Sequence, residues 1–146
     1  MIVNNDKKIE FQISELKILS FFENSTHKLK LTKKQVEKGD VYTNSNIAIY
    51  EKEKFIDFTI EGIFSIKKGG KRIELFGAKT FNSFFIKNFK ETVIKDKHGK
   101  FVKSNSLFIP LIDCSLSALR GILVALPKDS YYQDIILPHL DSTKFI

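Results

Sequence analysis

FIDFTIEGIFSIKKGGKRIELF, residues Phe55 to Phe76, carries the clearest structural signal in the chain. Apolar and polar residues alternate from Phe55 to Ile66, which is typical of a half-buried strand. One face of this strand carries Phe55, Asp57, Thr59, Glu61 and Ile63, and the other carries Ile56, Phe58, Ile60 and Gly62. The glycines in Lys67–Lys71 permit positive φ, and Arg72–Phe76 returns as a partner strand. The stretch therefore predicts an antiparallel hairpin.

Toward the N-terminus, Ile9–Ile13 alternates in the same way and predicts a strand that continues past a kink at Ser14–Glu15. His27–Leu31 also alternates, and Asn44–Asn46 has the composition of a turn. Thr32–Lys38 fits either a short helix that begins at a Thr32 cap or a long hairpin loop.

Toward the C-terminus, Thr92–Lys95 and Lys100–Phe108 predict a second hairpin with a turn at Asp96–Gly99. Leucine and isoleucine then recur at helical spacing, which predicts a helix from a Ser115 cap to Leu126. We predict a strand-rich α+β fold with antiparallel strands and one main late helix at about residues 115–126.

The length of 146 residues indicates a single domain, 1–146, with sub-halves conceivable at 1–66 (strand-rich) and 67–146 (basic hairpins plus helix). Cys114 is the single cysteine, which excludes an internal disulfide and favours a reducing compartment. The polar start lacks the apolar core of a signal peptide, and apolar runs such as Gly121–Leu126 are shorter than the roughly 20 residues of a membrane span. We expect a cytoplasmic protein with no membrane segment.

Positive charge is concentrated in one stretch, Lys67–Lys103. It holds eleven basic and three acidic residues, a net charge of +8, whereas the remainder of the chain has a net charge of −1. The same stretch is rich in phenylalanine. Lysines that follow phosphates and rings that stack on bases are the two components of single-strand nucleic-acid binding.

This pattern predicts a sequence-tolerant, non-enzymatic nucleic-acid-binding protein that prefers single strands, with DNA expected over RNA. The expected binding residues are Lys67, Lys68, Lys71, Arg72, Lys79, Phe81, Phe85, Lys87, Phe89, Lys90, Lys95, Lys97, Lys100, Phe101 and Lys103. The plainer interpretation is that the phenylalanines form the core and the lysines solvate the outer face. The alternative function is a protein-interaction or assembly subunit whose basic face binds an acidic protein.

Phe89–Leu126 is similar to the core of the PC4-like single-stranded DNA-binding proteins, which include the Whirly and Pur types. The matching features are the Asp96–Gly99 turn, the basic Lys100–Lys103 strand, the apolar Leu107–Leu111 segment and the Ser115–Leu126 helix. The chain departs from that pattern in having Phe108-Ile109-Pro110 before the helix and no Trp. The resemblance implies a curved antiparallel sheet around a nucleic-acid strand, with the helix supporting the sheet or a dimer. In a two-unit arrangement, the N-terminal half would supply the second sheet.

Asp113–Ala118 also partly resembles the D-x-S-x-x-G signature of PilZ cyclic-dinucleotide receptors. Ala118 replaces the glycine, however, and no Arg-x-x-x-Arg motif precedes it. A capped helix start explains Asp113 and Ser115 more simply.

The sequence gives few signals of catalysis. The three histidines are isolated, so we expect no zinc site and no cofactor. Cys114 is expected to be a structural thiol. Glu15-Leu16-Lys17, with Asp6 upstream, fits half of a nuclease metal site. Asp57 and Glu61 share a strand face and could pair as metal ligands, so a small metal-dependent nuclease is a minor alternative. A helper of a phage or mobile element fits the size. A homodimer could form through Leu116, Leu119 and Leu123, unless this helix face covers the protein's own sheet.

Overall fold

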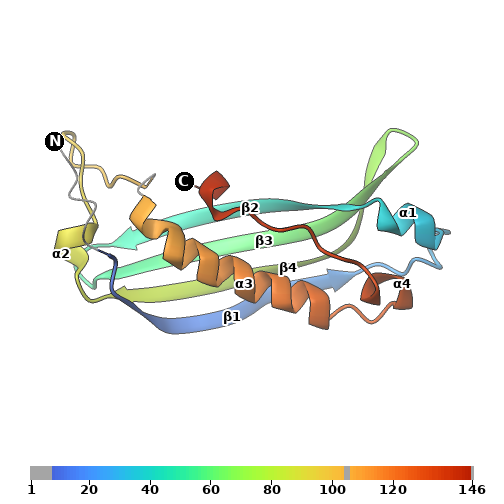
Figure 1. Cartoon of the computed structure of the whole chain (residues 1–146), viewed down its shortest axis with the longest axis horizontal. Coiled ribbons are helices and arrows are strands. Elements are labelled where there is room, and N and C mark those ends of the chain that lie inside the picture. The colour runs from blue at the N-terminus through green and yellow to red at the C-terminus, as the bar shows by residue number, and fades with distance from the viewer. Residues whose placement is uncertain (1–7, 104–105, 146) are drawn as a thin grey trace.

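A four-stranded antiparallel sheet in the order β1-β4-β3-β2 forms the body of the protein (Figure 1). The structure, a computed structural model, describes residues 8–103 and 106–145. The strands are β1 (Phe11–Glu23), β2 (Asp40–Tyr50), β3 (Phe55–Lys68) and β4 (Lys71–Ile86). Gly69 and Gly70, with φ of 60° and 77°, form the tip between β3 and β4. The predicted hairpin is therefore confirmed, and it supplies the two central strands.

One long helix, α3 (Ile109–Ala125), completes the fold. The short helices are α1 (Lys33–Glu37), α2 (Phe89–Thr92) and α4 (Ser130–Gln133), and single 3-10 turns lie at Ser106–Phe108 and Ser142–Phe145. The predicted class, a strand-rich α+β fold with a curved antiparallel sheet and one main late helix, is confirmed.

Helix α3 packs on one face of the sheet. Its buried residues are Leu111, Ile112, Ser115, Leu116, Leu119 and Leu123. A Cβ atom built on Gly62 of β3 would lie 3.0 Å from Leu119 and 3.1 Å from Leu123, so the missing side chain allows the close approach of the helix. In Figure 1, α3 and the C-terminal segment cross the same face of the sheet. The helix face considered for dimerisation therefore covers the protein's own sheet.

The predicted start of this helix at Ser115 is wrong. Pro110 occupies the first turn of α3, where its missing N–H removes no helical hydrogen bond. Ser115 is fully buried in the helix interior, and its hydroxyl donates to the carbonyl of Leu111 at 3.0 Å. The helix begins at Ile109, six residues and nearly two turns before Ser115.

The second hairpin, predicted at residues 92–108, is much shorter than expected: the turn at Asp96–Gly99 is present, but its only pairing among the described residues is one antiparallel bridge, and residues 104–105 lie outside the described residues. The Asn88 side chain accepts from the N–H of Glu10 and donates to the carbonyl of Lys8, which ties the end of β4 to the start of β1. The chain then forms α2, and a single bridge between Lys95 and Phe101 closes the following turn. The Asp96 carboxylate accepts from the backbone N–H groups of His98 and Lys100, which confirms the predicted turn.

The two alternatives for Thr32–Lys38 are resolved in favour of a helix. Thr32 caps α1, and Gln35 completes a capping box with it. His27–Leu31, predicted as a strand, forms turns instead, with Lys30 at a φ of 54°. Asn44–Asn46, predicted as a turn, lies within β2. The conceivable boundary at 66/67 falls inside the β3–β4 hairpin, and strands from both sides of it share one sheet.

By length and composition alone, Ser106–Ala125 is long and apolar enough to cross a membrane, contrary to the expectation from short apolar runs. The core helix of a globular domain meets the same criterion. Here, the apolar side of this segment is buried on the sheet.

We expect Leu119→Ala to lower the free energy of unfolding by about 2–5 kcal/mol, because the Leu119 side chain of α3 is fully buried against Gly62 of β3. Urea denaturation measures this change. Val124→Ala on the same helix is the matched control; Val124 is 59% exposed, so its loss should be less than about 0.5 kcal/mol. Equal losses in the two variants would contradict the packing of α3 described here.

Candidate nucleic-acid interface

The face of the sheet opposite α3, called the open face from here on, carries five partly exposed aromatic rings on β2, β3 and β4, and Phe22 of β1 lies on the same face beside Gly77. The five rings are Tyr42 and Tyr50 from β2, Phe55 from β3, and Phe81 and Phe85 from β4. Tyr42 is 39% exposed and Tyr50 is 47% exposed, whereas the three phenylalanines are half-buried. In Figure 1, α3 and the C-terminal segment lie on the other face. The rings of the open face are therefore accessible.

Three of these rings form a row across the sheet. Tyr50 pairs with Phe55 in the strand register, and Phe55 pairs with Phe85. The Phe55 and Phe85 rings meet edge to face, with their centroids 5.6 Å apart. This contact fixes the relative orientation of the two rings, both of which are half-buried.

Two cations lie over the other two rings. The Lys17 ammonium is 5.2 Å from the centroid of the Phe81 ring, and the Arg72 guanidinium is 4.0 Å from that of Tyr42. Each cation–π contact stabilises the ring by about 0.5–1 kcal/mol at such exposed positions. Positive charge thus lies beside rings that could stack on a base.

The middle of the open face contains a shallow hollow of about 460 Å³. It is lined by Leu19, Asn44, Asn46, Thr59, Glu61 and Lys79, among others. Nearby, the Ser83 hydroxyl donates to the Asp57 carboxylate at 2.6 Å. Acidic and basic groups are about equal in number here, so the middle of the open face is not a strongly positive surface.

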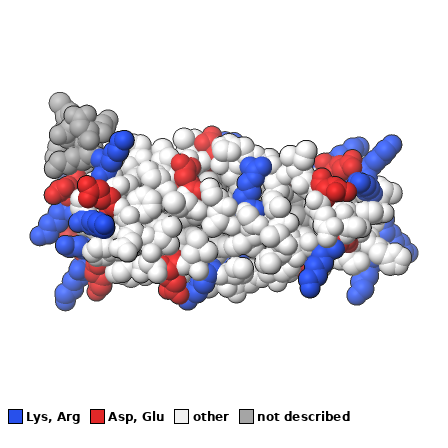
Figure 2. Space-filling view, turned by 60° about the horizontal axis from the view of Figure 1, so that its bottom comes forward, with Lys and Arg blue, Asp and Glu red and all other residues white. Residues whose placement is uncertain are grey.

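The predicted basic stretch is divided between the two ends of the elongated molecule. Lys67, Lys68, Lys71 and Arg72 are exposed at the β3–β4 tip. The opposite end, beyond the end of β4, carries exposed Lys87, Lys90, Lys95, Lys97, Lys100 and Lys103. Because β4 has 16 residues, at roughly 3.3 Å per residue the two groups are about 50 Å apart. On the side shown in Figure 2, Lys and Arg likewise gather at the two ends.

Of the predicted binding residues, Lys79, Phe81 and Phe85 therefore share the open face. Phe89 is only 3% exposed, and its ring packs edge to face on the half-buried Phe101, so the structure gives Phe89 no surface on which a base could stack. Lys95 forms an ion pair with Glu51 at 2.7 Å.

Tyr42, Tyr50 and Phe55 were not among the residues predicted to bind. The signal for Phe55 was available, since the alternation of β3 already placed it with Asp57 and Thr59. The signal for the two tyrosines was lost because Asn44–Asn46 has turn composition, which concealed the alternation of β2.

Of the residues in the minor nuclease alternative, Glu15, Asp57 and Glu61 lie on the open face, and Asp6 lies outside the described residues. Within residues 8–103 and 106–145, no three His, Cys, Asp or Glu side chains come close enough together to hold a metal ion. Burial raises the pKa of the Cys114 thiol, and the charge of Asp113 raises it further. Less of the reactive thiolate is therefore present at neutral pH.

Comparisons with known proteins give little more. No protein-family model and no curated protein matches the chain. One solved structure that aligns with it is described as a protein of unknown function from Streptococcus agalactiae. The two are 10% identical, with a TM-score of 0.42, and the alignment covers 81% of this chain and 87% of the other.

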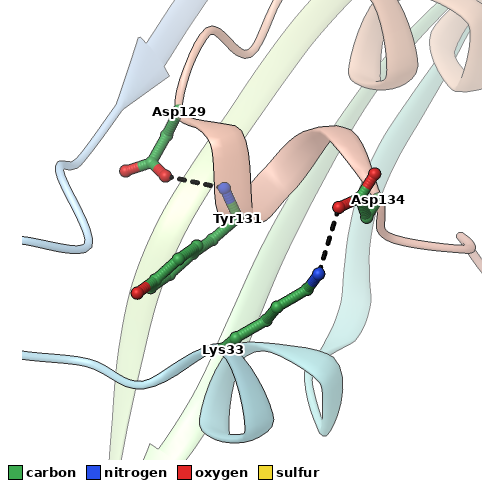
Figure 3. A network of polar contacts seen from close by, with 4 residues as sticks. All are labelled: Lys33, Asp129, Tyr131 and Asp134. Carbon is green, nitrogen blue, oxygen red and sulfur yellow. Dashed lines mark hydrogen bonds and ion pairs between the residues drawn. The ribbon is translucent and has the colours of Figure 1, made fainter.

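A separate polar network at the β1 end joins the C-terminal segment to the body of the protein. The Asp129 carboxylate accepts from the N–H and hydroxyl of Thr26 and from the N–H of Tyr131. Figure 3 shows the Tyr131 contact beside the ion pair between Lys33 and Asp134. The partners of Asp129 are all within the protein, so we assign this network a structural role.

We expect Asp129→Asn to weaken stability in a pH-dependent way. Burial raises the pKa of Asp129, but the hydrogen bonds from Thr26 and Tyr131 outweigh it and leave the pKa below its ordinary value of 3.8. A lowered pKa stabilises the protein above about pH 4, and this contribution is lost as the pH falls through the folded-state pKa. The variant should be less stable by about 1–2 kcal/mol at neutral pH and should lose less stability on acidification.

Asp134→Asn is the matched control for this measurement by urea denaturation between neutral and acid pH. Its ion pair with Lys33 is exposed, so the change should be less than about 0.5 kcal/mol. An unaltered acid-stability profile in Asp129→Asn would exclude the proposed contribution of this carboxylate.

Proposed function

We propose that the protein binds single-stranded nucleic acid on the open face of its sheet, without strong sequence preference and without catalysis. The observation that carries this proposal is a sheet face that α3 leaves uncovered, with accessible rings between two basic ends. Sheet surfaces with exposed aromatic rings suit unstacked bases, because every base presents a flat face to stack on.

The distribution of charge suits the middle of the open face to bases and the two basic ends of the molecule to phosphates. Bases are uncharged and can lie over the central rings, beside acidic groups such as Asp57 and Glu61 that would repel phosphates. Phosphates are attracted to the lysines of the β3–β4 tip and of the opposite end. A strand that runs along β4 satisfies both requirements at once.

We expect Phe81→Ala and Tyr50→Ala each to weaken binding of a single-stranded oligonucleotide, because a stacked base contributes roughly 1–3 kcal/mol. This corresponds to a loss of about 5- to 150-fold in affinity. Fluorescence anisotropy measures it. Ile136→Ala removes a 92% exposed side chain outside the sheet and serves as the control. Unchanged affinity in both ring variants would exclude the open face as the site.

The two basic ends should contribute separately and additively. We expect a Lys67→Glu/Lys68→Glu variant and a Lys97→Glu/Lys100→Glu variant each to reduce the salt dependence of binding, since each lost phosphate contact removes about 0.7 from the log–log slope on single strands. Oligonucleotides of about 15 nucleotides should be affected by both variants. Oligonucleotides of about 5 nucleotides are too short to reach both basic ends, so the two variants together should reduce the salt dependence of their binding less.

A second candidate is a subunit that binds an acidic protein. It is favoured by the separation of the basic residues, because the β3–β4 tip forms a compact exposed cluster of Lys67, Lys68, Lys71 and Arg72. Loss of an acidic protein partner on charge reversal at the tip, together with negligible oligonucleotide binding at low salt, would select this candidate.

A further inference from the structure

Strand β1 presents an unusually apolar free edge. It pairs with β4 on one side only, so its other side is an edge of the sheet. Four of its aliphatic residues are about half exposed: Ile13 at 51%, Leu16 at 46%, Ile18 at 46% and Leu19 at 47%. In the view of Figure 2, which brings the β1 side of the molecule forward, the middle is mostly uncharged. A long apolar edge of this kind is a template for a further strand.

We infer that a second copy of this chain pairs with β1, strand against strand, about a two-fold axis. A two-fold interface requires a surface that is complementary to itself. An antiparallel pair of identical strands meets this requirement if the residues opposite one another are compatible. The sequence of β1 can therefore be tested register by register.

The structure restricts the registers. β1 has register shifts at Ser14 and Leu19, so its regular part is Glu15–Ile18. In an antiparallel pair, directly opposite residues have their side chains on the same face of the sheet, and side chains alternate along each strand. The two-fold axis must therefore place one residue opposite its own copy, and that residue is the centre of the register. The four candidate centres are Glu15, Leu16, Lys17 and Ile18.

Charge selects one of these centres. An axis at Glu15 or at Lys17 places that charged residue opposite itself, which is destabilising. An axis at Ile18 places Lys17 opposite the irregular Leu19. An axis at Leu16 places Glu15 of each copy opposite Lys17 of the other, and Leu16 opposite Leu16. Two opposite-charge pairs then flank an apolar centre.

The positions of these side chains agree with that register. Glu15 aligns with Ser83 and Lys17 with Phe81, so both charged side chains lie on the open face, where they form an exposed ion pair of 3.2 Å within one chain. Leu16 and Ile18 align with Asn82 and Thr80 on the α3 side. In the proposed dimer, Glu15 of each copy pairs with Lys17 of the other copy instead of with Lys17 of its own chain. Both side chains already lie on the open face, so neither has to move to the other face. The dimer would join two sheets into one of eight strands, whether or not the open face binds nucleic acid.

Analytical ultracentrifugation over a range of micromolar concentrations tests the inference. The wild-type chain should dimerise. Glu15→Lys and Lys17→Glu should each raise the dissociation constant by about tenfold or more, because two attractive pairs become two repulsive ones. Lys90→Glu, an equal change of charge on α2, should leave it unchanged. A wild-type chain that is monomeric throughout would overturn the inference.

Mixing the two charge variants distinguishes this register from every other interface. A Glu15→Lys chain presents two lysines and a Lys17→Glu chain presents two glutamates, so an equal mixture should form heterodimers with close to wild-type affinity. This result cannot arise from misfolding of either variant. Dimers that persist in both single variants, or a mixture that stays monomeric, would overturn the proposed pairing.

Discussion

Burial of one side of α3 against one face of the sheet is the interaction on which the rest of the structure depends. Gly62 allows Leu119 and Leu123 to approach the backbone of β3 closely, and the largest buried side chains lie on that side. With one main helix, the chain can cover only one face. The opposite face and the β1 edge are consequently left to solvent, and both proposed binding surfaces follow from this limit.

The parts of the fold that could be predicted from sequence are those whose signal is local. The alternation from Phe55 to Ile66, the glycine tip and the Thr32 cap each encode their structure within a few residues. The parts that could not be predicted depend on distant partners. Asn44–Asn46 is strand because β3 pairs with it, and the hairpin around Asp96–Gly99 is limited to a single bridge among the described residues.

The candidate site shows the same division. The clustering of lysines between Lys67 and Lys103 was evident from the sequence. In the structure, the extended strand β4 separates these lysines into two groups. Because β4 runs straight through the cluster, Lys71 and Lys87 lie at opposite ends of the molecule. Conversely, Tyr50, Phe55 and Phe85 are far apart in sequence, and only the strand register brings their rings into one row. Composition indicated the chemistry of the site, and topology determined where that chemistry lies.

The central claim is that bases stack on the open face, and aromatic proton NMR spectra during titration with a single-stranded oligonucleotide test it most directly. The ring signals of Tyr50, Phe81 and Phe85 should shift strongly, since a stacked base changes the local magnetic field. Those of Phe58 and Phe84, each only 1% exposed on the α3 side, should change little and provide the control within the same sample. Shifts confined to the β3–β4 tip, with the open-face rings unaffected, would contradict the account.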